Sequence, residues 1–174
     1  VPVFALAVAL GVRLLRLPDE VKARYDLSSL RFVVHGAAPC PVPVKQAMIA
    51  WWGPVVHEYF GSTETGIPIW HSAQEALAKP GTVGRANEGG IVKIFGPNGE
   101  PCGVNEIGEI FMRQTAIPDF VYHRKAGARE EAGREGLISV GDVGYLDEDG
   151  YLFLCDRKRD MVISGGVNIY PAEI

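Results

Sequence analysis

The chain is poor in cysteine: Cys40, Cys102 and Cys155 are the only three in 174 residues, with no CxxC pair or Cys/His spacing. An odd number of cysteines without such spacing argues against a disulfide framework and against a zinc site. Cys155 lies in an alternating apolar run and is expected to be a small core residue. Free thiols are typical of a reducing compartment, so we expect a cytoplasmic protein.

The chain also lacks a basic surface. Its formal net charge is −4, and the basic run Arg157-Lys158-Arg159 stands between two aspartates. A nucleic-acid-binding domain requires a stripe or patch of Lys and Arg. The charge pattern therefore argues against a nucleic-acid partner.

A transmembrane segment is not expected. Residues 1–10 are apolar but have about half the length that a membrane-spanning helix needs, and they carry no basic leader and no Met. The composition, with 47% hydrophobic and 22% charged residues, is that of an ordinary globular protein. The length fits one domain, or one domain with a fragment, and we expect an internal piece of a longer protein.

Residues 1–78 are expected to alternate strand and helix. Residues 31–34 form a short β-branched run that stops at Gly36, which predicts a buried strand, and residues 55–59 predict the next strand. Between them Pro41 opens a helix whose apolar residues recur every three or four positions, at Val44, Ala47, Met48 and Trp51. This order favours an α/β fold with parallel strands, whose ligands bind at the strand C-termini.

Residues 79–156 change in character. Gly and Pro become frequent, and short β runs at residues 90–95, 108–113 and 151–154 replace the helical periodicity. Residues 97–100 predict a hairpin-type turn, and residues 147–150 predict another turn. This portion is expected to be a small sheet or distorted β-barrel, with an exposed helix or loop at residues 119–136.

The most informative segment combines an aromatic pair, small residues, hydroxyls and a carboxylate where an apolar run ends. It reads Glu58-Tyr59-Phe60-Gly61-Ser62-Thr63-Glu64-Thr65-Gly66. A purine can stack on an aromatic ring, hydroxyls can bind phosphate oxygens, and a carboxylate can hold Mg²⁺. Taken alone, Ser62 and Thr63 could instead cap a helix, and Glu64 could be a surface charge.

Four further segments accompany this one: residues 34–39, 141–151, 156–163 and 164–174. Together and in this order they resemble the adenylate-forming superfamily of acyl-CoA synthetases, luciferases and peptide-synthetase adenylation domains. They are most similar to bacterial fatty-acid or steroid-acid CoA ligases. The resemblance implies that residues 1–156 belong to the large N-terminal AMP-binding domain of such an enzyme. It also implies that residues 157–174 form the hinge and the start of a truncated C-terminal domain.

The activity that the resemblance implies has two steps. A carboxylate attacks the α-phosphate of ATP to give an acyl-adenylate, with Mg²⁺ as the metal, and coenzyme A then displaces AMP to give a thioester. The phosphate loop and the catalytic lysine of the family would lie outside this chain. The isolated chain is therefore expected to be inactive.

The resemblance also implies roles for individual residues. The nucleotide site comprises Gly36, Ala37, Ala38, Glu58, Tyr59, Phe60, Gly61, Ser62, Thr63, Asp142, Leu154 and Arg157. Within it, Gly36–Ala38 lies along adenine, and Phe60 stacks on the base where most relatives have Tyr. Asp142 accepts hydrogen bonds from the ribose hydroxyls.

The remaining implied roles concern catalysis, movement and the other substrates. Thr63 and Glu64 are the catalytic residues, Thr63 on phosphate and Glu64 on Mg²⁺. Arg159 is the hinge, and the acyl pocket includes Gly66 and Ile67. The coenzyme A channel includes Ser164, Gly165 and Gly166. From the residues alone, Gly141-Asp142 and Ser164–Gly166 could equally be turns, and Arg159 a solvated charge.

Four histidines, His35, His57, His71 and His123, show no metal-ligand spacing and are expected to be structural. The apolar run after Glu64 favours a bulky apolar carboxylate, with fatty, aromatic and steroid acids all open. A homodimer is also among the expected partners. One alternative is an amino-acid or aryl-acid adenylation domain that loads a carrier protein. Another is a non-catalytic nucleotide-binding module.

Overall fold

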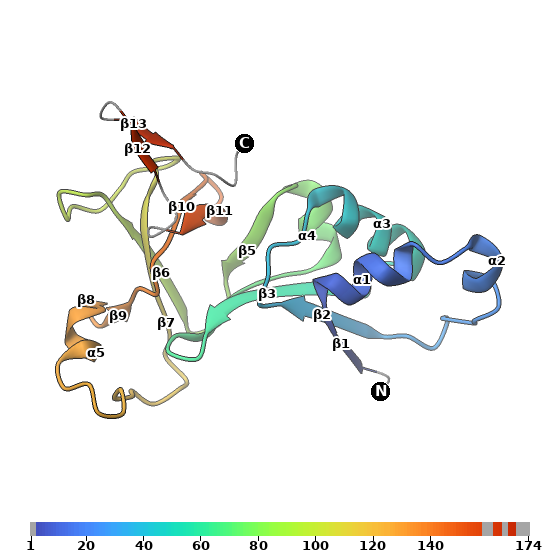
Figure 1. Ribbon diagram of the computed structural model, residues 1–174, viewed down its shortest axis with the longest axis horizontal. Coiled ribbons are helices and arrows are strands. Elements are labelled where there is room, and N and C mark those ends of the chain that lie inside the picture. Colours follow the sequence, from blue (N-terminus) through green and yellow to red (C-terminus); the bar gives the residue numbers. More distant parts are fainter. Residues whose placement is uncertain (1–2, 158–161, 165–166, 170–174) are drawn as a thin grey trace. The chain divides into compact units, whose positions relative to one another are not determined.

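The computed structural model describes residues 3–157, 162–164 and 167–169. The chain divides into two compact units, each considered by itself (Figure 1). The first contains Val1–Phe60 and Trp70–Gly84, and the second contains Gly61–Ile69 and Arg85–Ile174. The domain boundaries expected from the sequence, after residues 78 and 156, stay predictions.

The first unit is built on parallel strands joined through helices. Its elements are β1 (Val3–Ala7), α1 (Val8–Leu15), α2 (Asp19–Lys22), β2 (Phe32–Gly36), α3 (Val42–Trp52), β3 (Val56–Ser62), β4 (Gly66–His71), α4 (Ala73–Ala78) and β5 (Thr82–Ala86). The strand order is β1-β2-β3-β4-β5, and β2 pairs in parallel with both β1 and β3. The expected α/β fold with parallel strands is confirmed. Strands β3 and β4 run on into the second unit.

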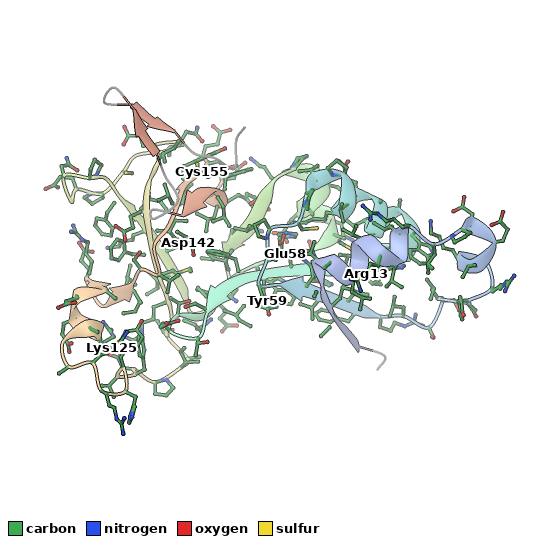
Figure 2. All side chains as sticks on the ribbon, viewed as in Figure 1. Arg13, Glu58, Tyr59, Lys125, Asp142 and Cys155 are labelled. Carbon is green, nitrogen blue, oxygen red and sulfur yellow. The ribbon has the colours of Figure 1, made fainter. Side chains whose placement is uncertain are left out.

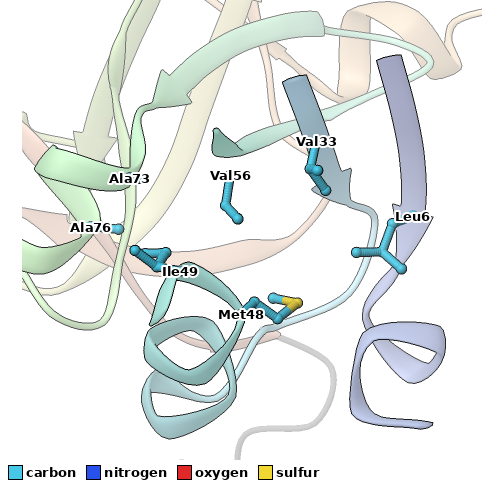
Figure 3. Close-up of a cluster of buried hydrophobic side chains, with 7 residues drawn as sticks. All are labelled: Leu6, Val33, Met48, Ile49, Val56, Ala73 and Ala76. Carbon is cyan, nitrogen blue, oxygen red and sulfur yellow. The ribbon is translucent and has the colours of Figure 1, made fainter. Parts of the chain in front are cut away.

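The core of the first unit lies between this sheet and its helices. The buried side chains are Leu6, Val33, Met48, Ile49, Val56, Ala73 and Ala76 (Figure 3). Helix α3 begins after Pro41, whose φ of −56° suits a helix start, and ends at Gly53 with φ 84°. Its buried face carries Lys45, Met48 and Ile49. Of the predicted apolar stripe, only Met48 is fully buried, because Lys45 occupies part of the buried face.

The second unit is an antiparallel sheet. Its elements are β6 (Gly90–Phe95), β7 (Gly108–Gln114), α5 (Ala128–Glu131), β8 (Gly133–Arg134), β9 (Leu137–Ile138), β10 (Asp142–Leu146), β11 (Tyr151–Arg157), β12 (Val162–Ser164) and β13 (Val167–Ile169). The order is β11-β10-β7-β9-β8, β6 also pairs with β7, and β12 and β13 form a separate pair. The sheet is open rather than closed into a barrel. Strands β8 and β9 have two residues each, too few to carry a closing ladder.

Both turns expected in this part of the chain are present. The Asp147 carboxylate accepts hydrogen bonds from the backbone N–H groups of Asp149 and Tyr151, at 3.0 and 2.8 Å, and so closes the β10–β11 hairpin. Gly99, with φ 82°, donates to the carbonyl of Gly96 at 2.9 Å. Cys155 is buried, as expected. In the described part of the chain no helix is long and apolar enough to span a membrane.

Candidate functional site

The loop after β2, where adenine is expected, has an unusual backbone. A Cβ atom at Gly36 would lie 2.7 Å from the Tyr59 ring and 2.8 Å from the Tyr59 carbonyl oxygen, so only glycine fits. Ala37 has φ 64°, a left-handed conformation that costs a non-glycine residue energy. Ala37 and Ala38 are exposed. Ala37 and Ala38 therefore present small exposed side chains after β2, and their contact with adenine stays a prediction.

The segment after β3 forms a tight turn, not the start of a helix. The Ser62 backbone N–H donates to Thr65 Oγ1 at 2.9 Å. The N–H groups of Glu64 and Thr65 both donate to Ser62 Oγ at 3.2 Å. Thr65 is buried, whereas Thr63 is exposed and Glu64 half-buried. The turn thus presents one hydroxyl and one carboxylate, and β3 continues through Ser62, three residues beyond the strand end predicted at residue 59.

Two glycines make this turn possible. A Cβ atom at Gly61 would overlap the carbonyl oxygen of Gly66, so the two ends of the turn meet backbone to backbone. Gly66 has φ 70° and packs against Ile117. The neighbouring Ile67 is 42% exposed. Of the expected acyl-pocket residues, Gly66 thus has a packing role and Ile67 offers apolar surface.

Asp142 and Arg157, fifteen positions apart in the sequence, are cross-strand partners in the β10–β11 ladder (Asp142 is labelled in Figure 2). Leu154 pairs with Gly144 in the same ladder and is half-buried. Asp142 begins a strand, and the preceding Gly141, with φ 85°, donates to Ser139 Oγ at 3.1 Å. The backbone therefore brings the two expected ribose-contacting residues to one end of one hairpin.

A buried charged cluster lies beneath the β3 segment, and sequence reasoning missed it. The Glu58 carboxylate forms an ion pair with Lys45 Nζ, and His71 Nε2 lies 2.7 Å from Glu58 Oε2 (Glu58 is labelled in Figure 2). Lys45 Nζ is also 3.1 Å from His71 Nε2, and His71 Nδ1 is 3.0 Å from the Ser72 carbonyl oxygen. Glu58, Lys45 and His71 are 3%, 7% and 1% exposed. Helix α3 and strands β3 and β4 are thus tied together by polar contacts inside the core.

The electrostatics of this cluster follow from burial and pairing. Burial acts to raise the pKa of Glu58, but the hydrogen bond from His71 and the charge of Lys45 outweigh it, so the pKa of Glu58 is lowered. His35 lies beside the cluster, with Nδ1 3.7 Å from Glu58 Oε1, and neither ring nitrogen has a hydrogen-bond partner. Burial lowers the pKa of His35 to about 4, so this imidazole is neutral at pH 7.

The sequence carried a weak signal for this cluster. Lys45 sits at a position that the α3 periodicity turns inward, and a lysine there requires a buried partner. The partners Glu58 and His71 are 13 and 26 residues away, which no local pattern connects. His57 instead stacks on Phe32, with ring centroids 4.5 Å apart. His123, the last of the four histidines, is exposed.

The donor set around the turn suits Mg²⁺ better than a metal held wholly by protein. The described residues contain no group of three or more His, Cys, Asp or Glu side chains that could hold a metal ion. Mg²⁺ usually binds one or two carboxylates, substrate phosphates and several waters. The carboxylate of Glu64 and the neighbouring hydroxyl of Thr63 fit that mode of binding.

Comparison with known proteins identifies the family. Residues 1–118 match the family described as "AMP-binding enzyme", and the chain belongs to that family. It is 37% identical to a 2-succinylbenzoate–CoA ligase of Bacillus velezensis over 147 residues, which are 84% of this chain and 30% of that protein. It is 31% identical to a 4-coumarate–CoA ligase-like protein of Arabidopsis thaliana over 175 residues, 99% of this chain and 32% of that one. The chain thus spans about a third of the length of these relatives.

Solved structures show the same fold. O-succinylbenzoate coenzyme A synthetase from Bacillus subtilis, in complex with ATP and magnesium ion, superposes with a TM-score of 0.82 at 30% identity, over 99% of this chain and 35% of that chain. An amide bond synthetase from Marinactinospora thermotolerans superposes with a TM-score of 0.88 at 29% identity, over 98% and 35%. The mixed sheet and helices are those of the N-terminal domain of adenylate-forming enzymes.

The described residues do not extend to every predicted site. Arg159, Gly165 and Gly166 lie outside them, and Ser164 is described only as the last residue of β12. The hinge and the coenzyme A channel therefore stay predictions.

Proposed function

We propose that the protein containing this chain is an AMP-forming acid–thiol ligase. In the first step a carboxylate oxygen attacks the α-phosphorus of ATP, and pyrophosphate leaves with the electron pair of the broken P–O bond. In the second step the thiolate of coenzyme A attacks the acyl carbon, and AMP leaves. Membership of the AMP-binding family and the CoA ligases among the relatives support this reaction.

The observation that carries the proposal is the turn Ser62–Thr65. Its hydrogen bonds fix the backbone and leave Thr63 and Glu64 accessible. Adenylation builds negative charge on the phosphates, and catalysis of phosphoryl transfer consists mostly of positioning and charge neutralisation. We assign Thr63 to a phosphate oxygen and Glu64 to Mg²⁺, which supplies the positive charge when bound.

The nucleoside is assigned to two further sets of residues, one in each unit. Gly36, Ala37 and Ala38 offer the backbone surface for adenine, and Phe60 offers the stacking ring. Asp142 accepts from the ribose hydroxyls, with Arg157 as the second contact and Leu154 packing beside it. These assignments rest on the family motif, the left-handed Ala37 and the cross-strand pairing of Asp142 with Arg157.

Glu58 and Tyr59 act differently from their neighbours. The carboxylate of Glu58 is committed to Lys45 and His71 inside the core, so its contribution to the nucleotide site runs through the backbone of β3. Tyr59 contributes through its close contact with Gly36. Gly61 and Ser62 shape the turn.

The acyl substrate is proposed to be an apolar carboxylic acid, because apolar residues around Ile67 follow the Glu64 turn. Fatty, aromatic and steroid acids define the panel to test. We propose Arg159 as the hinge between the two steps and Ser164–Gly166 as part of the coenzyme A channel. A homodimer stays an untested expectation.

The test is product analysis with the full-length protein. ATP, Mg²⁺, coenzyme A and each acid of the panel are incubated together, and products are identified by mass spectrometry. Equal amounts of AMP and acyl-CoA are expected with at least one acid. Formation of ADP, or no nucleotide conversion with any acid, contradicts the proposal.

A second candidate function has the same adenylation step but transfers the acyl group to a different acceptor. The similarity to an amide bond synthetase favours testing amines in place of the thiol. If the acyl-adenylate forms but its acyl group is transferred to an amine and not to coenzyme A, the proposed adenylation step is confirmed and the proposed thiol acceptor is wrong.

A further inference from the structure

A tyrosine far along the chain contacts the carboxylate assigned to Mg²⁺. The Tyr122 hydroxyl donates to Glu64 Oε1 at 3.1 Å, and the two residues are 58 positions apart. Both belong to the second unit. The segment that carries Tyr122 follows β7 and contributes none of the predicted site residues.

Tyr122 is placed by contacts within its own loop. Its ring packs edge-on against Phe120, with centroids 5.1 Å apart, and the Arg129 guanidinium lies 5.5 Å from the centroid of the Phe120 ring. Arg129 also donates to both carboxylate oxygens of Asp119, at 2.9 and 3.2 Å. A bidentate pair of this kind adds geometric definition as well as energy. The loop is therefore built to hold the hydroxyl at one place.

Glu64 is fixed at its backbone and held at one carboxylate oxygen. Its N–H donates to Ser62 Oγ, and the carbonyl of the next residue, Thr65, accepts from the Gln114 N–H at 2.8 Å. Along the described parts of the chain, the only hydrogen-bond partner of its carboxylate is Tyr122, at Oε1. No described residue donates a hydrogen bond to the other oxygen, Oε2.

We propose that Tyr122 is a positioning residue for the metal carboxylate: its hydroxyl occupies Oε1 and orients Glu64 so that Oε2 binds the divalent cation of the nucleotide complex. The inference rests on the proposed function, which assigns Mg²⁺ to Glu64. Carboxylates that bind metals are commonly held by a hydrogen bond from a second residue, and losing that residue typically costs about 10–100-fold in metal affinity or activity. The alternative is that Tyr122 competes with the metal for Glu64.

The test uses Tyr122→Phe in the full-length protein, because phenylalanine keeps the ring that packs on Phe120 and removes only the hydroxyl. The matched control is Tyr25→Phe, which removes the hydroxyl of a tyrosine that is 66% exposed. Mn²⁺ binding is measured by electron paramagnetic resonance in the presence of α,β-methylene-ATP, so that no turnover is required. Nucleotide affinity without metal and the thermal midpoint are measured alongside.

The expected result is Mn²⁺ affinity about 10–100-fold weaker in Tyr122→Phe, with metal-free nucleotide affinity, thermal midpoint and the Tyr25→Phe control unchanged. Mn²⁺ affinity equal to or tighter than that of the wild type overturns the inference, and tighter binding identifies competition. If Tyr122→Phe does not fold, Tyr122→Leu, which also carries no hydrogen-bond donor, is measured in the same way, and wild-type affinity in that variant overturns the inference.

A double-mutant cycle separates this inference from the proposed function. In a Glu64→Gln background, Tyr122→Phe should have no further effect on Mn²⁺ affinity, since the two residues act as one unit. Additive losses overturn the positioning role while leaving Glu64 as the metal residue. If the wild type itself binds no metal with the nucleotide, the proposed function and this inference fail together.

Discussion

Replacing Lys45 with methionine should destabilise the first unit strongly. The substitution keeps most of the side-chain volume but removes the ammonium that pairs with Glu58. The Glu58 carboxylate, only 3% exposed, then keeps its hydrogen bond with His71, and His35 Nδ1 lies 3.7 Å from its other oxygen.

The expected magnitude follows from the desolvation of that carboxylate. Removing one partner of a buried ion pair typically costs about 3–5 kcal/mol, because the remaining charge stays buried without compensation. The hydrogen bond from His71 persists, so we expect the lower end, about 3 kcal/mol. A loss of 1 kcal/mol lowers the thermal midpoint of a domain of about 150–250 residues by about 2–4 °C, so the midpoint should fall by roughly 6–12 °C.

The assay is thermal unfolding of the full-length protein, followed by circular dichroism, with Lys93→Met as the control. Lys93 Nζ and Glu135 Oε2 form an ion pair of 2.6 Å, but their side chains are 48% and 51% exposed. Exposed pairs contribute about 0.2–1 kcal/mol. The same substitution at Lys93 should therefore shift the midpoint by only about 0–4 °C.

A double substitution sharpens the test. Lys45→Met with Glu58→Leu replaces the whole pair with apolar groups and should be clearly more stable than Lys45→Met alone, since no unpaired charge remains. A Lys45→Met midpoint shift no larger than that of the control would refute the reasoning. It would mean that water or a rearrangement compensates Glu58.

Three further predictions concern the site and its surroundings. Glu64→Gln should slow acyl-adenylate formation by about 10²–10³-fold, as expected for one lost electrostatic contact, and should spare thioester formation from a pre-made acyl-adenylate; equal losses in both steps, measured by rapid quench, would make Glu64 structural. Gly36→Ala should cost about 1–3 kcal/mol and raise the KM for ATP, because its Cβ would collide with the Tyr59 ring and carbonyl; an unchanged midpoint and KM would show that the loop simply shifts. Because the pKa of His35 is lowered from 6.5 to about 4, the unfolded chain binds more protons than the folded chain between these pH values, and the free energy of unfolding should fall by about 3 kcal/mol as the pH drops from 6.5 to 4. The variant His35→Leu should show a smaller decrease in thermal midpoint over this pH range. An equal decrease in the variant would show that another group causes the pH dependence.

Much of the fold could be predicted because its signals are local. The β-branched run before Gly36 and the short runs of the second half became β2, β6, β7 and β11 within a few residues of the predicted bounds. Pro41 and Gly53 bracket α3 as a helix start and stop should. The strand–helix–strand order then required parallel pairing, which the β1–β2–β3 registers confirm.

The contacts that involve side chains far apart in sequence could not be predicted. The periodicity of α3 turns Lys45 inward, but nothing local connects it to Glu58 or His71. The Tyr122–Glu64 hydrogen bond spans 58 positions and depends on how a loop packs. The family resemblance implies a role for Glu64 in binding Mg²⁺ but carries no information on what holds its carboxylate.

The open sheet of the second unit shows a further limit. Frequent glycines and short β runs suit an open sheet and a closed barrel equally well. The difference lies in the length of the edge strands, and β8 and β9 are two-residue strands that local propensity does not delimit.

The central claim is carboxylate activation by adenylation, and ATP–pyrophosphate exchange by the full-length protein tests it most directly. Exchange reports the reversible first step alone, without coenzyme A. We predict exchange of labelled pyrophosphate into ATP that requires both Mg²⁺ and one acid of the fatty, aromatic and steroid panel, and that Glu64→Gln reduces about 10²–10³-fold. Exchange that is absent with every acid, or that proceeds equally without any acid, would contradict the account.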